Sequence, residues 1–158
     1  MTNERGDSVK KLVTDGMLAA VLLVTGMFKI PSFLPGAEFQ ISAPFAVAVA
    51  KILGFKRYLM IGLAASVCGF AVGAQNLLNI MVAMVYRVVV GLLLDLFPDS
   101  KAAVALCGPC GTFVSRLLLA QVLGVDWVLL VLYALPGMAF TAVLAPVFIK
   151  AGRRFGLQ

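Results

Sequence analysis

The stretch AQNLLNIMVAMVYRVVVGLLLDLF, residues 74–97, decides the fold because it is long and apolar enough to cross a bilayer. Asn76, Asn79, Tyr86 and Arg87 recur along it at intervals of three, seven and one. At about 100° per residue, these offsets place all four residues on one side of a helix. The stretch therefore predicts a membrane helix whose polar side faces something other than lipid.

The rest of the chain is similarly apolar, with 62% hydrophobic and 13% charged residues over 158 positions. This composition excludes an ordinary soluble domain, because so much apolar surface could not be hidden from water. The sequence instead predicts an all-α integral membrane bundle of about six transmembrane helices. Residues 1–158 form a single transmembrane domain, the second helix is short, and residues 1–9 are expected to be frayed. The apolar segments are 12–28, 41–53, 58–74, 77–97, 102–123 and 127–149.

The basic residues give the chain a net charge of +6, which could suggest binding to nucleic acid. They cluster, however, before the first predicted helix, between the second and the third, and after the last. With an even number of spans these clusters share one compartment, which the positive-inside rule identifies as the cytoplasm. We therefore expect a lipid bilayer as partner, no nucleic acid, and both termini in the cytoplasm. The clusters are Arg5, Lys10 and Lys11; Lys51, Lys56 and Arg57; and Lys150, Arg153 and Arg154.

The segment KIPSFLPGAEFQISA, residues 29–43, is long for a connection, since most connections in compact domains run about 4–6 residues. Glu38, Phe39 and Gln40 offer a carboxylate, an aromatic face and an amide just before the second helix. On the outer side of the membrane, this long loop is expected to cover a cavity of the bundle as a lid. The alternative is a solvated connector in which Glu38 pairs with Lys29.

Small residues line two of the predicted helices. Gly16 and Ala20, with Ala19 beside them, form a small-xxx-small surface on the first helix, which allows another helix to approach closely. Such a surface serves either packing inside the bundle or docking to a separate subunit. The third helix has small residues at spacings of four, three and four, which predicts close packing against a neighbour: Gly62, Ser66, Gly69 and Gly73.

Prolines occur inside the last two predicted helices. Pro109, in the motif CGPCG at residues 107–111, leaves the carbonyl one turn earlier without its usual donor. We therefore expect the fifth helix to bend or unwind at this point. Pro136 and Gly137 predict a second kink, in the sixth helix.

Two arginines fall within the apolar segments, Arg87 near the midpoint of its helix and Arg116 closer to the outer surface. Arginine keeps its charge, and even low estimates put its cost near a membrane helix centre at about 2.5–3.5 kcal/mol. Each must therefore have a partner. One interpretation is pairing with Asp95, Glu38 or backbone carbonyls; the other is that a guanidinium grips the carboxylate or phosphate of a ligand.

The sequence offers little for catalysis or metal binding. Cys107 and Cys110 form one CxxC, but there is no second pair and no histidine. No GxxxxGK[ST] phosphate loop and no Ser/His/Asp set is present. We therefore expect no enzyme activity, no metal and no cofactor in this chain.

Taken over essentially its whole length, the chain resembles the S component, the substrate-binding membrane subunit, of energy-coupling factor (ECF) vitamin transporters. The resemblance lies in a small six-helix hydrophobic protein with both ends inside and in the small pair Gly16 and Ala20. It also lies in the long first outer connection, PSFLPGAEFQISAP, which leads into a short second helix.

The resemblance implies a protein of the prokaryotic plasma membrane that binds a small organic micronutrient outside and delivers it inward. A transmembrane coupling subunit and two ATPase subunits would be its partners, and those partners would use ATP. In the family, a pair of alanines spaced like Gly16 and Ala20 docks on the coupling subunit, so the face with Gly16, Ala19 and Ala20 corresponds to that interface, although a glycine stands at position 16.

The family forms its pocket near the outer face from the first loop and the later helices. The corresponding residues are Glu38, Phe39, Gln40, Asn76, Asn79, Arg116 and Trp127, with Tyr86 and Arg87 as further candidates. The membrane arginines favour a vitamin, precursor or amino-acid-like ligand with an anionic group. The chain also lacks the N-terminal histidine arrangement of the nickel and cobalt members.

Two other classes of function are compatible with the sequence. A small oligomeric channel or exporter working without ATPases would have a polar path across the whole membrane, with Arg87 as part of it. The apolar residues Gly91–Leu94 below the polar positions instead favour a pocket closed on the inside. A membrane assembly factor without a ligand would leave both arginines paired internally.

Overall fold

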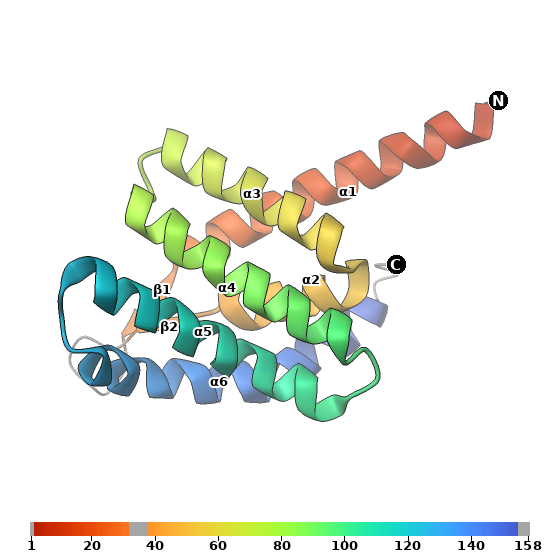
Figure 1. Cartoon of the computed structure of the whole chain (residues 1–158). Helices are drawn as coiled ribbons and strands as arrows, with labels where there is room; N and C mark the ends of the chain where they lie inside the picture. The colour runs from red at the N-terminus through yellow and green to blue at the C-terminus, as the bar shows by residue number, and fades with distance from the viewer. Residues whose placement is uncertain (1, 32–37, 155–158) are drawn as a thin grey trace.

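The computed structural model describes residues 2–31 and 38–154, which form a bundle of six helices with one short β-hairpin (Figure 1). The predicted all-α membrane bundle with a short second helix is confirmed. The helices are α1 (Thr2–Met27), α2 (Ser42–Leu53), α3 (Phe55–Ala71), α4 (Leu77–Leu96), α5 (Lys101–Leu123) and α6 (Trp127–Arg154). The hairpin consists of β1 (Lys29–Pro31) and β2 (Glu38–Gln40).

The short helix α2 lies inside the bundle, where it contacts each of the other five helices. Its segment Ala46–Ala50 alternates alanine and valine and is buried throughout. Small side chains allow several neighbours to approach one helix closely. Because α2 is enclosed by protein, it need not be long enough to span the bilayer by itself.

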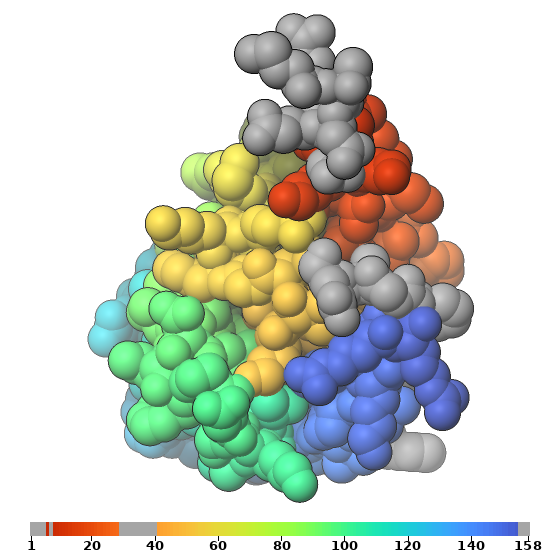
Figure 2. All heavy atoms as spheres, turned by 90° about the vertical axis from the view of Figure 1, so that its right-hand side faces the viewer, coloured from red at the N-terminus to blue at the C-terminus, as the bar shows by residue number. Residues whose placement is uncertain are grey.

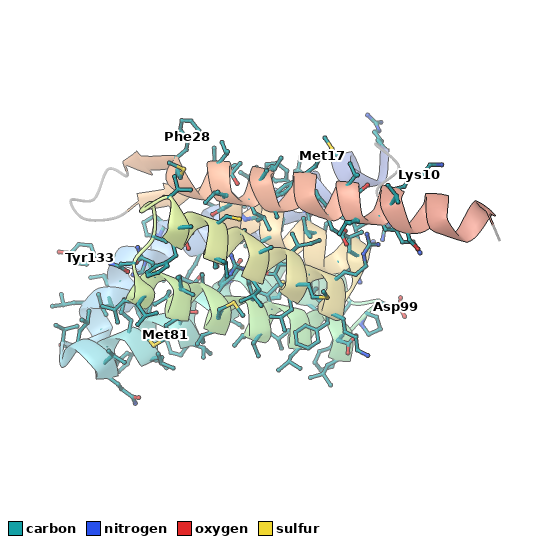
Figure 3. All side chains as sticks on the ribbon, turned by 90° about the horizontal axis from the view of Figure 1, so that it is seen from above. Lys10, Met17, Phe28, Met81, Asp99 and Tyr133 are labelled. Atoms are coloured by element: carbon teal, nitrogen blue, oxygen red, sulfur yellow. The ribbon has the colours of Figure 1, made fainter. Side chains whose placement is uncertain are left out.

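The helices alternate in direction, so their connections gather at two ends of the bundle. The start of α1 and the end of α6 lie at the same end in Figure 1, together with the α2–α3 and α4–α5 connections, and Figure 2 views the molecule from that side. Lys10 and Asp99 lie toward this end in Figure 3, whereas Phe28 and Tyr133 lie toward the other. We call the first the basic end, because it carries Lys10, Lys11, Lys51, Lys56, Arg57, Lys101, Lys150, Arg153 and Arg154. The second, the hairpin end, carries the β-hairpin and the turns at 72–76 and 124–126.

Two polar contacts tie helices together at the basic end. Arg57 Nη2 lies 2.6 Å from Asp15 Oδ1 and joins α3 to α1. The Lys51 ammonium, near the end of α2, donates to the backbone carbonyl of Pro98 in the α4–α5 connection. Both contacts are accessible to water or headgroups rather than enclosed in the core.

Glycines mark the closest contacts between helices. A Cβ at Gly62 of α3 would lie 2.4 Å from Arg87 Cδ on α4, and one at Gly91 of α4 would lie 2.2 Å from the Phe55 ring on α3. The close packing predicted for α3 is therefore confirmed at Gly62 and Gly69 but not at Gly73, which follows the end of α3 and where a Cβ would meet nothing within 4 Å. On α5, a Cβ at Gly108 would lie 2.4 Å from Thr141 Cγ2 of α6.

Two expectations about local structure, unwinding at Pro109 and fraying of the first residues, are wrong. Helix α5 continues without a break through Pro109, and α6 continues through Pro136 and Pro146, so the bends expected at Pro109 and at Pro136 and Gly137 stay predictions. Each proline removes a single backbone hydrogen bond, and packing against neighbouring helices keeps the rest of the helix in place. Residues 2–9 are helical rather than frayed. Extension of an existing helix is favourable, because each added residue contributes one further hydrogen bond after the first turn has formed.

Helices α4, α5 and α6 are each long and apolar enough to cross a membrane by length and composition. Their mean hydropathies are 2.2, 1.6 and 2.2 over the most apolar 18-residue window, and α2 is a shorter apolar helix. Large apolar side chains such as Leu77, Leu106 and Val143 are exposed on the outside of the bundle, as expected for a surface that faces lipid.

Candidate functional site

The first turn of α4 places two asparagines at the hairpin end. The Asn76 side-chain oxygen accepts a hydrogen bond from the backbone N–H of Asn79 at 2.8 Å and so caps the helix. Both residues are exposed. Asn76 thus has a structural task at this position, whereas the Asn79 side chain lies at the surface of the same turn.

The candidate lid contains a β-hairpin that the sequence reading did not anticipate. Strand β2 pairs antiparallel with β1 and packs against α6, with Glu38 opposite Pro31, Phe39 opposite Ile30 and Gln40 opposite Lys29. Residues 32–37 and the side chains of Glu38, Phe39 and Gln40 lie outside the part that the structure describes, so the contacts predicted for these side chains stay predictions. The Pro35-Gly36 pair is the sequence signal that could have indicated a hairpin.

Arg116 and Trp127 approach the hairpin end from α5 and α6. Arg116 is half-buried and lies seven residues before the end of α5, or about 10 Å along its axis. Trp127 is the first residue of α6 and is 50% exposed. The fold therefore brings Asn79, Arg116, Trp127 and strand β2 to the same end of the bundle.

Tyr86 and Arg87 lie deeper. The Tyr86 hydroxyl donates to the carbonyl oxygen of Ala43 at 3.2 Å, which joins α4 to the start of α2. Its ring packs on α5, where a Cβ at Gly111 would lie 2.9 Å from Tyr86 Cδ2. Tyr86 thereby holds the helix that directly follows the hairpin.

Arg87 is 7% exposed and is bound to the bundle by several contacts. Its Nη1 donates to Ser66 Oγ at 2.7 Å and contacts the Met84 sulfur at 3.5 Å. Its aliphatic stem lies on Gly62. Arg87 is eleven residues along α4 from Asn76, or about 16 Å, so the structure does not place it with the asparagines.

In the described part of the chain, two buried side-chain polar atoms lack a hydrogen-bond partner: the Tyr58 hydroxyl and Gln75 Oε1. Tyr58 is fully buried in the core of the bundle near α3's start, whereas Gln75 lies in the turn between α3 and α4 at the hairpin end. The sequence reading singled out neither residue. Gln75 could have been found from its position directly before Asn76, in the polar turn that precedes α4.

Two sides of α1 differ in exposure. Ala19, Leu18 and Leu22 belong to the buried core, whereas Gly16 and Ala20 are exposed. A Cβ at Gly16 would meet nothing within 4 Å. The exposed side, which we call the open face of α1, also carries apolar side chains, and in Figure 3 Met17 points away from the bundle: Val9, Leu12, Val13, Met17, Val21 and Val24.

The cysteines show no grouping of metal ligands. Cys107 is buried, and its thiol contacts the Val104 carbonyl in its own helix at 3.4 Å, whereas Cys110 is exposed. Within residues 2–31 and 38–154, no three His, Cys, Asp or Glu side chains gather as a metal site would require.

Comparison with known proteins identifies the class. The chain is 45% identical over 136 residues to Protein BioX of Lysinibacillus sphaericus, an alignment that covers 86% of this chain and 82% of the relative. No protein-family model and no solved structure matches the chain. The chain is an S component of the ECF type, a non-enzymatic membrane protein of the prokaryotic plasma membrane that binds a substrate in vitamin uptake. It belongs to the same family as Protein BioX.

Proposed function

We propose that this S component captures the vitamin biotin at the hairpin end and delivers it to the cytoplasm. Membership of the BioX family carries the proposal. Biotin has a carboxylate on an aliphatic chain and a ureido ring with N–H donors and a carbonyl acceptor. These groups match the guanidinium, amide and aromatic side chains that the sequence offers around the hairpin end.

In this proposal, Arg116 binds the carboxylate, because its half-buried guanidinium lies within reach of the hairpin end. Asn79 and Gln40 bind neutral polar groups, Phe39 and Trp127 supply apolar contact, and Glu38 accepts from a donor. Asn76 contributes through the cap of α4. Tyr86 and Arg87 hold α2 and α3 in place around the pocket, a role supported by their bonds to Ala43 and Ser66.

We further propose that the hairpin end faces outward and that both termini lie in the cytoplasm, since the basic end carries most of the lysines and arginines. A transmembrane coupling subunit docks on the open face of α1, at Gly16 and Ala20, and Ala19 supports this face from the core. Two ATPase subunits use ATP to drive the transport cycle, and this chain holds no cofactor.

The direct test is binding by the purified protein in detergent, after removal of endogenous ligand. Titration calorimetry with biotin is expected to give one site per chain, and native mass spectrometry of gently purified protein should show one biotin retained. If biotin does not bind while the protein stays folded, the ligand assignment is wrong. A thermal-shift screen of other anionic vitamins would then identify the correct class.

A further inference from the structure

The turn between α3 and α4 holds the amide of Gln75 in an unusual position. The backbone N–H groups of Ala74 and Gln75 both donate to the Gly69 carbonyl, at 2.9 and 3.1 Å, which fixes the turn. The Gln75 side chain folds back on α3, so that a Cβ at Gly69 would lie 3.1 Å from Gln75 Cδ and 3.0 Å from Leu23 Cδ1. The amide therefore lies where α1, α3 and the turn meet.

The amide oxygen of Gln75 is buried without a hydrogen-bond donor. A buried acceptor that has lost its water and found no partner is unfavourable, and such atoms in folded proteins call for a physical reason. The backbone N–H groups from Val72 to Gln75, in contrast, all donate to carbonyls near the end of α3, and the Asn76 side chain caps α4. The oxygen without a donor belongs to the Gln75 side chain, which packs between α1 and α3.

Gln75 lies in the α3–α4 turn at the hairpin end, the end of the bundle toward which the proposed site residues lie. Gln75 directly precedes Asn76, the cap of α4, and its neighbour Leu23 lies one turn before the end of α1. At that end, α1 meets the start of α2, because a Cβ at Gly26 would lie 3.8 Å from Ser42 Oγ. The Gln75 side chain keeps part of its surface exposed, so rotation about its own torsions can present the oxygen to a ligand while the turn stays fixed.

We infer that the Gln75 side-chain carbonyl accepts a hydrogen bond from an N–H group of the ligand, and that it selects ligands with such a donor. The inference rests on the proposed function, and it assigns a protein residue to the neutral, ureido end of the ligand. A ureido ring supplies N–H donors, whereas a linear carboxylate supplies none. Arg116 would then recognise the carboxylate of the ligand and Gln75 its ureido ring. Both residues together, rather than either one alone, would determine which substrate binds.

The test compares Gln75→Met with wild type by titration calorimetry. Methionine keeps the length of the side chain but removes the acceptor, so biotin is expected to bind about tenfold more weakly because its N–H is left unpaired. The ligand-free variant should melt at a higher temperature than wild type, since a buried unpaired oxygen has been removed. Gln121→Met, on the exposed surface of α5, is the matched control and should change neither value.

Ligands provide a second arm that needs no variant. Biotin can be methylated on either of its two ureido nitrogens, and one of these two forms should bind wild type about tenfold more weakly than biotin does. Gln75→Met should bind that methylated form and biotin with equal affinity, because the variant already lacks the hydrogen bond that methylation removes. Equal affinity of wild type for biotin and both methylated forms overturns the inference, as does unchanged biotin affinity in a folded Gln75→Met. Either result leaves the proposed function intact, whereas absence of biotin binding by wild type removes both.

Discussion

The two arginines of the apolar helices have different surroundings. Arg87 is almost fully buried, with its guanidinium on Ser66 and its stem on Gly62. Arg116 is half-buried and lies closer to the hairpin end. Depth along the helix therefore separates a residue that joins α3 to α4 from one that can meet a ligand from outside.

Arg116→Ala should weaken biotin binding by about 2 kcal/mol or more, that is about 30-fold, because a buried carboxylate would lose its partner. Calorimetry of the purified variant measures the effect. Arg57→Ala removes an arginine at the basic end and should leave affinity unchanged. A folded Arg116→Ala with wild-type affinity would exclude Arg116 from the site.

Gly62→Ala should destabilise the bundle by about 1–3 kcal/mol, because the added methyl displaces the Arg87 stem that now lies on the glycine. Gly16→Ala is the matched control, since its methyl meets nothing, and replacing glycine in a helix interior is expected to stabilise by about 0.5–1 kcal/mol. Thermal unfolding in detergent should therefore shift in opposite directions. A Gly62→Ala variant as stable as wild type would contradict the described packing of Arg87 on α3.

At the scale of elements, the ends of α4 and α5 were predicted closely, whereas α1 begins ten residues before the predicted 12–28 and α3 is displaced by three residues from 58–74. The predicted ranges 77–97 and 102–123 differ by one residue from α4 and α5 because local signals set their ends. Asn76 and Ser100 cap the helices, and Gly124 adopts a left-handed conformation with φ of 66°. In contrast, Ser66 as the partner of Arg87 and the pairing of β1 with β2 depend on which segments meet in space, which hydrophobic periodicity does not specify.

Helix α1 illustrates the same limit. The spacing of Gly16, Ala19 and Ala20 predicted a small-residue surface but left open whether it packs inside or docks outside. The structure divides the set, with Ala19 in the core and the other two on the open face. The exposed pair is consistent with the proposed docking role.

Ala20→Leu should therefore abolish or strongly reduce transport by the assembled complex, because the larger side chain prevents close approach of a partner helix. Binding of biotin by the isolated protein should stay at its wild-type value. Uptake of labelled biotin by cells and calorimetry on the purified protein measure the two effects. Val143→Leu, on the exposed surface of α6, is the control; loss of binding in Ala20→Leu would assign this face to internal packing instead.

At the scale of the whole molecule, charge and polarity divide the bundle along its length. Lysines and arginines gather at the basic end, and the candidate site residues Asn79, Arg116 and Trp127 approach the other (Figures 1 and 3). The sequence predicted this division because successive connections alternate between the two sides of a membrane, and an even number of spans places both termini on the side of the basic connections. It could not show that α2 is the common contact of all the other helices, since that follows from packing.

Cysteine labelling tests the orientation. In a variant without the three native cysteines, Asp126→Cys should react with a membrane-impermeant maleimide added to intact cells, because the α5–α6 turn faces outward in the proposed orientation. Asp99→Cys, in the exposed α4–α5 connection, should react only after the membrane is permeabilised. The reverse pattern would place the hairpin end in the cytoplasm and contradict the proposed direction of capture.

The basic end also restricts how the bundle can turn within the bilayer. Carrying an arginine or lysine to the hydrocarbon centre costs at least about 2.5–3.5 kcal/mol per residue, whereas the same side chains are attracted to anionic headgroups. A rotation that laid the helices along the membrane plane would therefore keep the basic end at its own headgroup layer as the pivot. In such a rotation the hairpin end would move through the bilayer while the basic end stayed in place. The charge distribution therefore determines which end of the molecule would be displaced.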